Sequence, residues 1–320
     1  MLSSSKSLKE LSTRIQSEKE VFCSGLFFSA RWFIASLAGN RGTQLIILPD
    51  KDSAEYCCAD LYNMVEGDKV FFLPSSGKNI ERSKYKSSLG VQRTSALGKI
   101  AEAAENEENL FIVSYPDALE EGIPSEDRIR NPLLKLSKGD EISHESVERI
   151  LFEAGFENVD FVAEPGQFTI RGGVVDIFSY SHDKPYRLTL FGDEIEEIHI
   201  FDCNTQLSVA SVECADIFPD LATVSEEISS GNSVFDILPS STTIWLDSSD
   251  MYRDRDFYAH TLDFRRIYLE VPLSRTDADP VRFSISPQPV FNKNFELLTE
   301  DIRSKIENGY RVIIFGEKKK

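Results

Sequence analysis

The sequence contains no long hydrophobic run. No apolar stretch approaches the ~20 residues that a membrane-spanning helix needs, and the opening MLSSSKSLKELSTRIQSEKE lacks the apolar centre of a signal peptide. These two absences predict a cytoplasmic chain with no membrane partner. The 320 residues, of which 41% are hydrophobic, are enough for two or three domains with buried cores.

Cysteine and histidine are scarce. The five cysteines include no C-x-x-C pair, which predicts reduced, mostly packed thiols and neither a disulfide framework nor a zinc site. The four histidines have no metal-ligand spacing, and no G-x-S-x-G nucleophile elbow occurs. Acidic pairs such as Asp193-Glu194 and Glu196-Glu197 are typical of a solvated surface. We therefore predict no metal site and no catalytic residue.

Basic residues are few in the middle of the chain. Residues 1–110 contain 14 basic and 14 acidic side chains, residues 111–215 contain 8 and 21, and residues 216–320 contain 13 and 18. The middle segment therefore has a net charge of −13 (8 − 21) within a total of −18. Phosphate backbones are bound by clustered lysine and arginine, so this segment would repel DNA. We expect its partner to be a protein, and DNA binding to be weak and salt-sensitive.

Strand-like and helical segments alternate in the first part of the chain. We expect strands at 21–28, 44–49, 69–74 and 110–115, and helices at 30–38, 50–64 and 91–104. Asp50 is suited to cap the second of these helices. Nearly continuous apolar strands separated by helices predict a doubly wound parallel sheet.

The pattern changes near Ser125 and changes back near Asp216. In between, we expect a helix at 143–156 and then strands at 159–162, 168–171, 174–178, 186–191 and 195–201. After it, we expect strands at 242–246, 266–271 and 310–315, with a helix at 295–306. The simplest architecture is an α/β domain in two parts, 1–122 and 216–320, interrupted at 123–215 by an inserted α+β domain with an antiparallel sheet. Because the chain stops just after an apolar strand, we expect it to be a fragment of a longer protein.

The first strand–helix turn lacks the residues of a phosphate loop. Such a loop needs glycines for its backbone to wrap phosphates, and a Lys-Ser/Thr pair for the phosphates and magnesium. In the turn Gly25-Leu-Phe-Phe-Ser-Ala-Arg-Trp32, only Gly25 fits. Phe27 and Phe28 replace permissive residues, and Ala30-Arg31 stands in place of Lys-Ser/Thr. We expect Phe27, Phe28 and Arg31 to fill the space that phosphates would need.

A second turn also departs from that pattern. Ser76-Gly-Lys-Asn79 has Phe72 at the position of the first glycine, and Asn79 replaces the hydroxyl residue. Neither turn is expected to bind ATP in the usual way, so we predict no cofactor.

The stretch QFTIRGGVVDIFSY, residues 167–180, places charges inside a strand-like run. Its simplest interpretation is a β-hairpin with the Gly172-Gly173 pair in a tight turn. Arg171 would then end one strand, and Asp176 would be its ion-pair partner. The alternative is that Arg171 serves a binding function.

The longer run PGQFTIRGGVVDIFSYSHDKPYRLTLFGDEIEEIHIFDCNTQ, residues 165–206, resembles the inserted domain shared by UvrB and the bacterial transcription-repair coupling factor, Mfd. The order of this domain and its α/β halves matches that family's N-terminal module, which implies a helicase-like α/β domain. UvrB has a working phosphate loop and a tyrosine-rich hairpin that contacts damaged DNA, and the coupling factor lacks both. Here the first turn is degenerate, and only Tyr85 stands in place of several tyrosines. The sequence therefore resembles the coupling factor's UvrB-homology module.

The resemblance implies a partner and the residues that bind it. The inserted domain of this family docks onto UvrA. The arginine of the Arg-Gly-Gly turn corresponds to Arg171, and the arginine and phenylalanine of the next strand correspond to Arg187 and Phe191. Asp176 is kept as a structural partner, and Ser179-Tyr180 departs from the family's usual proline. Contacts of the family protein with RNA polymerase and its ATP-driven DNA translocation belong to domains outside these 320 residues.

Two other functions remain open. One is a nucleotide-dependent enzyme, UvrB itself or a helicase domain with an unusual loop. The other is an autonomous scaffold whose acidic face binds basic proteins, which predicts binding that is indifferent to Arg171 and abolished by moderate salt.

Overall fold

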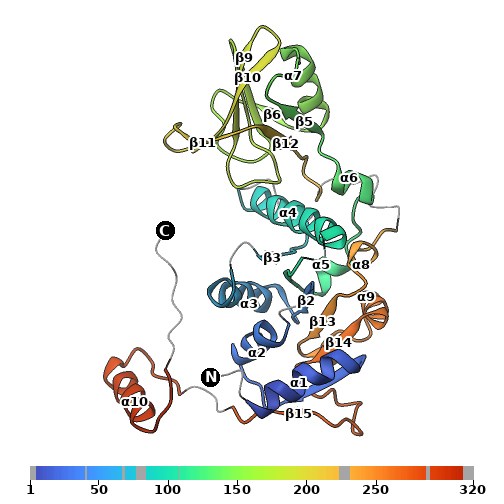
Figure 1. The fold of residues 1–320 in the computed structure, drawn as a ribbon, viewed down its shortest axis with the longest axis vertical. Coiled ribbons are helices and arrows are strands. Elements are labelled where there is room, and N and C mark those ends of the chain that lie inside the picture. The colour runs from blue at the N-terminus through green and yellow to red at the C-terminus, as the bar shows by residue number, and fades with distance from the viewer. Residues whose placement is uncertain are drawn as a thin grey trace.

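The chain folds into an α/β domain and a separate domain built on a mostly antiparallel sheet (Figure 1). The computed structural model describes residues 5–39, 42–66, 69–76, 84–106, 108–222, 231–285 and 289–312, with the backbone alone at 84–87. The expected turn at Ser76–Asn79 lies mostly outside these residues, as does most of the expected strand at 310–315.

The α/β domain is built on a seven-stranded parallel sheet with the strand order β15-β1-β14-β13-β2-β4-β3. Four strands precede the inserted domain and three follow it, and β13 pairs with β2 to join the two parts into one sheet. The strands are β1 (Glu20–Ser24), β2 (Gln44–Ile47), β3 (Val70–Phe72), β4 (Phe111–Ser114), β13 (Thr243–Leu246), β14 (Arg265–Tyr268) and β15 (Val281–Arg282). This arrangement confirms the predicted doubly wound sheet with an insertion.

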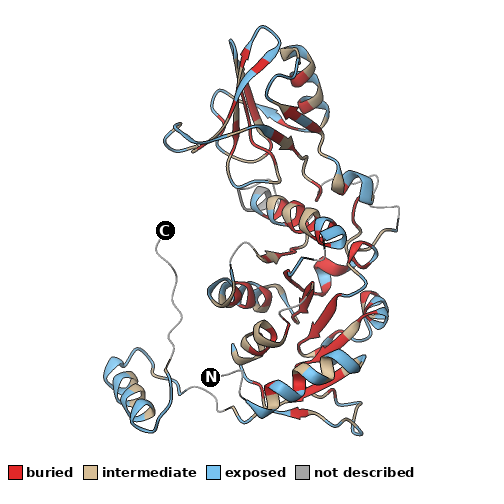
Figure 2. Ribbon diagram, in the orientation of Figure 1, coloured by how far each residue is buried: buried red, intermediate tan, exposed pale blue. Residues whose placement is uncertain are grey.

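Helices cover both faces of this sheet (Figures 1 and 2). One face packs against α1 (Lys6–Ser17), α2 (Ala30–Ala38) and α3 (Lys51–Met64). The other packs against α4 (Lys84–Asn106), α5 (Pro116–Glu120), α6 (Glu126–Arg130), α8 (Val234–Ile237) and α9 (Asp256–His260). The Asp50 side chain accepts a hydrogen bond from the Ser53 N–H at the start of α3, as its position predicts.

Helix α10 (Phe295–Glu307) differs from the other long helices because it has no buried residue. Asn294 caps it by accepting hydrogen bonds from the Glu296 and Leu297 N–H groups, which matches the expected helix at 295–306. No helix in the described part of the chain combines the length and apolarity required to cross a bilayer.

The inserted domain contains a six-stranded sheet with the order β11-β10-β9-β8-β7-β6. Its strands are β6 (Glu157–Asn158), β7 (Gln167–Arg171), β8 (Val174–Ile177), β9 (Tyr186–Phe191), β10 (Glu194–Phe201) and β11 (Ser208–Val212). All neighbours are antiparallel except β6 and β7. The inner face packs against α7 (His144–Glu153) and a two-stranded sheet of β5 (Leu134–Ser137) and β12 (Cys214–Ile217).

The expected strand at 159–162 is wrong. This segment is a loop that begins after the two-residue strand β6 and reaches the outer face of the sheet. Val162 is buried there against Phe178 and Phe201, whereas Phe161 is 65% exposed. The segment looked like a strand because it is β-branched and aromatic, but its apolar side chains pack on the sheet instead of pairing within it.

Candidate partner-docking surface

The outer face of the inserted sheet carries the residues singled out from the sequence. Along β9, Tyr186, Leu188 and Leu190 are buried in the core, so Arg187 and Phe191 share the opposite face, as their spacing predicts. Arg187 is paired with Asp176 on β8, and Arg171 on β7 is paired with Val174 on β8. The register of the three neighbouring strands therefore places Arg171, Asp176 and Arg187 on one face of the sheet.

Two tight hairpins frame this surface. Arg171 and Val174 are directly paired, so Gly172-Gly173 forms the predicted two-residue turn, with a φ of +58° at Gly172. Phe191 and Glu194 are paired in the same way around Gly192, with a φ of +63°. A positive φ at the first central residue is typical of type II′ turns, which favour glycine there. A Cβ at Gly173 would lie 2.7 Å from the Leu190 carbonyl oxygen, so this glycine also permits close approach of β9.

A buried carboxylate joins the two arginines. Asp176 is fully buried, and its oxygens accept hydrogen bonds from Arg187 Nε at 2.7 Å and Arg187 Nη2 at 2.8 Å. The same carboxylate accepts a hydrogen bond from Arg171 Nη2 at 3.1 Å. The hydrogen bonds to Asp176 raise the pKa of Arg187 above its ordinary value, although partial burial acts in the opposite direction. Two fixed guanidinium groups around one buried carboxylate leave positive charge at the surface.

The two arginines differ in how far they are exposed. The Arg187 side chain is 22% exposed, lies 4.3 Å from the centre of the Phe201 ring, and donates hydrogen bonds to the Gln206 backbone and side-chain oxygens. The Arg171 side chain is 42% exposed. The expected Arg171–Asp176 ion pair is therefore present, but it does not exclude a binding role. Arg187 is the more structural of the two arginines.

Phe191 is 76% exposed at the end of β9. Burying an apolar ring is favourable, so an exposed phenylalanine beside two guanidinium groups is a suitable anchor for a protein partner. Three further residues were not predicted for this surface: Phe201 and Gln206, which hold Arg187, and Phe161. Phe201 could not be placed by alternation because the register of β10 shifts along its length, and Phe161 lies in a segment that was wrongly predicted as a strand.

The degenerate phosphate loop between β1 and α2 is organised by packing. A Cβ at Gly25, whose φ is +76°, would lie 2.0 Å from the Phe283 carbonyl oxygen, so close approach of the chain after β15 requires glycine here. Phe27 and Phe28 are 42% and 71% exposed, so both rings reach solvent at this turn, and their filling of the phosphate space stays a prediction. Helix α2, which begins at Ala30, buries Trp32, Ile34 and Ala35.

Arg31 contacts the turn, where its Nε donates a hydrogen bond to the Leu26 carbonyl at 3.5 Å. Its Nη1 donates a hydrogen bond to the Asp247 carboxylate, and its Nη2 lies 3.8 Å from Glu270. Asp247 follows β13 and is buried, and burial raises its pKa to about 6, an effect that the nearby Arg31 opposes. In phosphate-loop enzymes, an aspartate at such a strand end holds magnesium. Here its partner is an arginine of the same chain.

Replacing Arg31 by alanine is expected to destabilise the fold more at pH 8 than at pH 5. A raised folded-state pKa means that the contribution of Asp247 to stability is lost as pH rises through about 6. Without Arg31 this pKa rises further, and each unit adds about 1.4 kcal/mol. We expect the cost of the substitution to grow by roughly 1–2 kcal/mol between these pH values, measured by urea unfolding.

The control is Asp247→Asn in the Arg31→Ala background, which removes the titrating group. The stability cost of Arg31→Ala, measured in the presence of Asp247→Asn, should then be the same at pH 5 and pH 8. An Arg31→Ala cost that is equal at both pH values would contradict the ion-pair interpretation.

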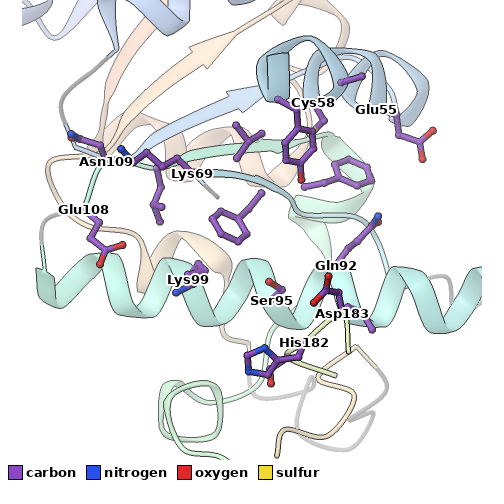
Figure 3. Close-up of a pocket in the computed structure, with 18 of the residues that line it drawn as sticks. Glu55, Cys58, Lys69, Gln92, Ser95, Lys99, Glu108, Asn109, His182 and Asp183 are labelled. Carbon is purple, nitrogen blue, oxygen red and sulfur yellow. The ribbon is translucent and has the colours of Figure 1, made fainter. Parts of the chain in front are cut away.

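A groove of about 1230 Å³ lies elsewhere in the α/β domain (Figure 3). It runs along the edge strand β3 between α3 and α4, and His182 and Asp183 of the inserted domain border it beside α4. In the sheet, four strands separate β3 from β1, so the groove is remote from the degenerate phosphate loop. Burial lowers the pKa of His182, whose ring packs edge-on against Tyr186 at 5.3 Å. The described residues contain no cluster of three His, Cys, Asp or Glu side chains that could hold a metal ion.

The outer-face cluster lies within the part of the chain that matches a known family. Residues 134–222 match the family model of the UvrB interaction domain. This range contains Arg171, Asp176, Arg187 and Phe191, and it begins and ends close to β5 and β12. The match confirms the resemblance to the UvrB-homology module of the transcription-repair coupling factor.

Individual relatives agree with this assignment. The chain is 26% identical to the transcription-repair-coupling factor of Bacillus subtilis over 63% of its own length, and 30% identical to that of Escherichia coli over 38%. It is also 28% identical to UvrABC system protein B of Carboxydothermus hydrogenoformans over 67% of its length. The matched parts span 17%, 10% and 34% of these three proteins, respectively. The chain is thus similar to a small part of a DNA-repair coupling factor.

Proposed function

We propose that this chain is the UvrB-homology module of a transcription-repair coupling factor and that it binds UvrA through Arg171, Arg187 and Phe191. Binding would recruit UvrA of nucleotide excision repair to lesions where RNA polymerase has stalled. The observation that carries the proposal is the cluster of two guanidinium groups and an exposed ring inside the matched UvrB interaction domain. In a segment of net charge −13, such a cluster is a local cationic anchor of the kind that dominates interfaces.

The test is a calorimetric titration of purified UvrA with the 320-residue chain. The proposal expects saturable binding that Arg171→Ala weakens. Absence of binding at tens of micromolar protein would contradict it. The acidic-scaffold alternative predicts binding that survives Arg171→Ala and is lost at moderate salt, so the same titration at two salt concentrations separates the two.

Within this proposal the chain is an adaptor with no ATPase and no cofactor of its own. It works in the cytoplasm, and it reaches RNA polymerase and DNA only through other parts of the parent protein. The Arg31–Asp247 pair supports this proposal because it occupies the turn where a phosphate loop would lie. The rival is a nucleotide-dependent repair enzyme of the UvrB or helicase type, which the similarity to UvrABC system protein B favours.

Millimolar Mg-ATP is expected to leave the melting temperature of this chain unchanged. A ligand that binds the native state must stabilise it, by about 2.7 kcal/mol at a concentration 100 times its dissociation constant. Scanning calorimetry with and without Mg-ATP measures the effect, and Mg-ADP is the matched ligand control. A stabilisation of several degrees would favour the enzyme and contradict the adaptor.

A further inference from the structure

Phe161 has the features of a docking residue that the sequence did not indicate. Its side chain is 65% exposed, and its ring centre lies 5.0 Å from Arg171 Cζ. We propose that Phe161 and Arg171 act together as one aromatic–guanidinium anchor that binds a carboxylate in a partly apolar site on UvrA. This inference rests on the proposed function and extends its surface from β9 towards the loop after β6.

The loop that carries Phe161 is held in place on both sides of the ring. Val162 is buried against Phe178 and Phe201 on the outer face of the sheet. The Val159 N–H donates to the Phe168 carbonyl at 2.9 Å, and the Ala163 and Glu164 N–H groups both donate to the Gln167 side chain at 2.9 Å. An exposed ring on a fixed loop loses little conformational freedom when a partner covers it. The ring is therefore positioned for binding before the partner arrives.

Arg171 is fixed by two contacts that leave part of its guanidinium available. Nη2 donates to Asp176, and the guanidinium lies within the distance of a cation–π contact with Phe161. This is the single hydrogen bond that the Arg171 side chain makes among the described residues, so its other N–H groups remain available to a ligand. A guanidinium presents planar, paired donors that match a carboxylate. An aspartate or glutamate of the partner fits these donors.

The chemistry of the partner site follows from both groups. A carboxylate would meet the Arg171 donors, and apolar side chains would cover the edge of the Phe161 ring. Covering the ring also removes water from around the guanidinium, and a charged contact is stronger in a drier environment. The anchor thus requires the ring as well as the charge, and neither alone reproduces it.

The experiment is a double-mutant cycle on UvrA binding with the whole chain. We expect Phe161→Ala to weaken the affinity by about 5- to 30-fold, the change that corresponds to roughly 1–2 kcal/mol. If the ring and the guanidinium act together, the double variant Phe161→Ala/Arg171→Ala should lose clearly less affinity than the product of the fold-losses of the two single variants. Phe161→Leu, which keeps an apolar side chain but loses the aromatic face, should lie between wild type and alanine.

The matched control is Phe152→Ala. Phe152 is 72% exposed on α7, which covers the inner face of the same domain, so its removal should leave UvrA binding unchanged. Melting temperatures of all variants show whether a loss of binding reflects unfolding. If Phe161→Ala is unstable, Phe161→Leu replaces it in the binding measurement.

The outcomes separate this inference from the proposed function. If Arg171→Ala weakens UvrA binding but Phe161→Ala and Phe161→Leu each bind like the wild type, the inference is overturned and the proposed function stands. Strictly multiplicative effects in the double variant overturn the joint anchor. No binding of UvrA by the wild-type chain overturns the proposed function and the inference with it.

Discussion

Replacement of Asp176 by asparagine should lower the free energy of unfolding by about 2–4 kcal/mol. The carboxylate is fully buried and holds Arg187 at 2.7 and 2.8 Å and Arg171 at 3.1 Å. An amide has no charge and offers one acceptor oxygen, so part of this hydrogen bonding is lost and Arg187 keeps a poorly compensated charge. The estimate is below that for a wholly buried pair because both arginines are partly exposed.

Urea unfolding of Asp176→Asn measures this effect, and Asp193→Asn is its matched control. Asp193 lies in the exposed turn between β9 and β10, where a surface substitution usually changes stability by less than ~0.5 kcal/mol. Affinity for UvrA should fall together with stability in Asp176→Asn, because the two arginines lose the group that orients them. An unchanged stability would show that the carboxylate is not the centre of this cluster.

Local signals predicted the secondary structure around the site. Helix α2 has the bounds expected from the sequence, and α3 begins after its Asp50 cap and ends at Met64 as expected. Strand β9 also has the expected bounds, and its alternation puts Arg187 and Phe191 on one face. Capping and periodicity depend on neighbours in the sequence, so the sequence alone carries them.

Contacts between distant segments were beyond this kind of prediction. Strands β5 and β12 pair although all six strands of the other sheet lie between them in the sequence. A strand was expected at 159–162, whereas the strand found here is the two-residue β6 at Glu157–Asn158. The Arg187–Asp176 contact depends on the register between β8 and β9, and the Arg31–Asp247 pair joins residues on either side of the inserted domain. Register and domain insertion determine which charges meet, and neither is encoded in a short window.

The three residues of the candidate docking surface differ in how much they contribute to the fold. Arg187 combines a buried ion pair with packing on Phe201, so Arg187→Ala should impair both folding and binding. Arg171 shares the same carboxylate but is more exposed, so its removal should affect stability less. Phe191 has neither of these roles in the fold. Its substitution therefore tests binding separately from stability.

Phe191→Ala should weaken UvrA binding by about 1–4 kcal/mol, the range found for anchor residues. The ring is 76% exposed, so its truncation should change the free energy of unfolding by less than ~0.5 kcal/mol. Calorimetric titration with UvrA and urea unfolding of the same preparation measure both quantities. Met251→Ala is the matched control because Met251 is 73% exposed but lies in the α/β domain.

A role of Phe191 limited to the fold predicts the opposite pair of results, a less stable protein with normal affinity. If Phe191→Ala and Met251→Ala both bind UvrA like the wild type, the exposed end of β9 is not part of the interface. Lost affinity in a fully stable Phe191→Ala variant would place the partner on the outer face of the sheet, because the ring shares that face with Arg187.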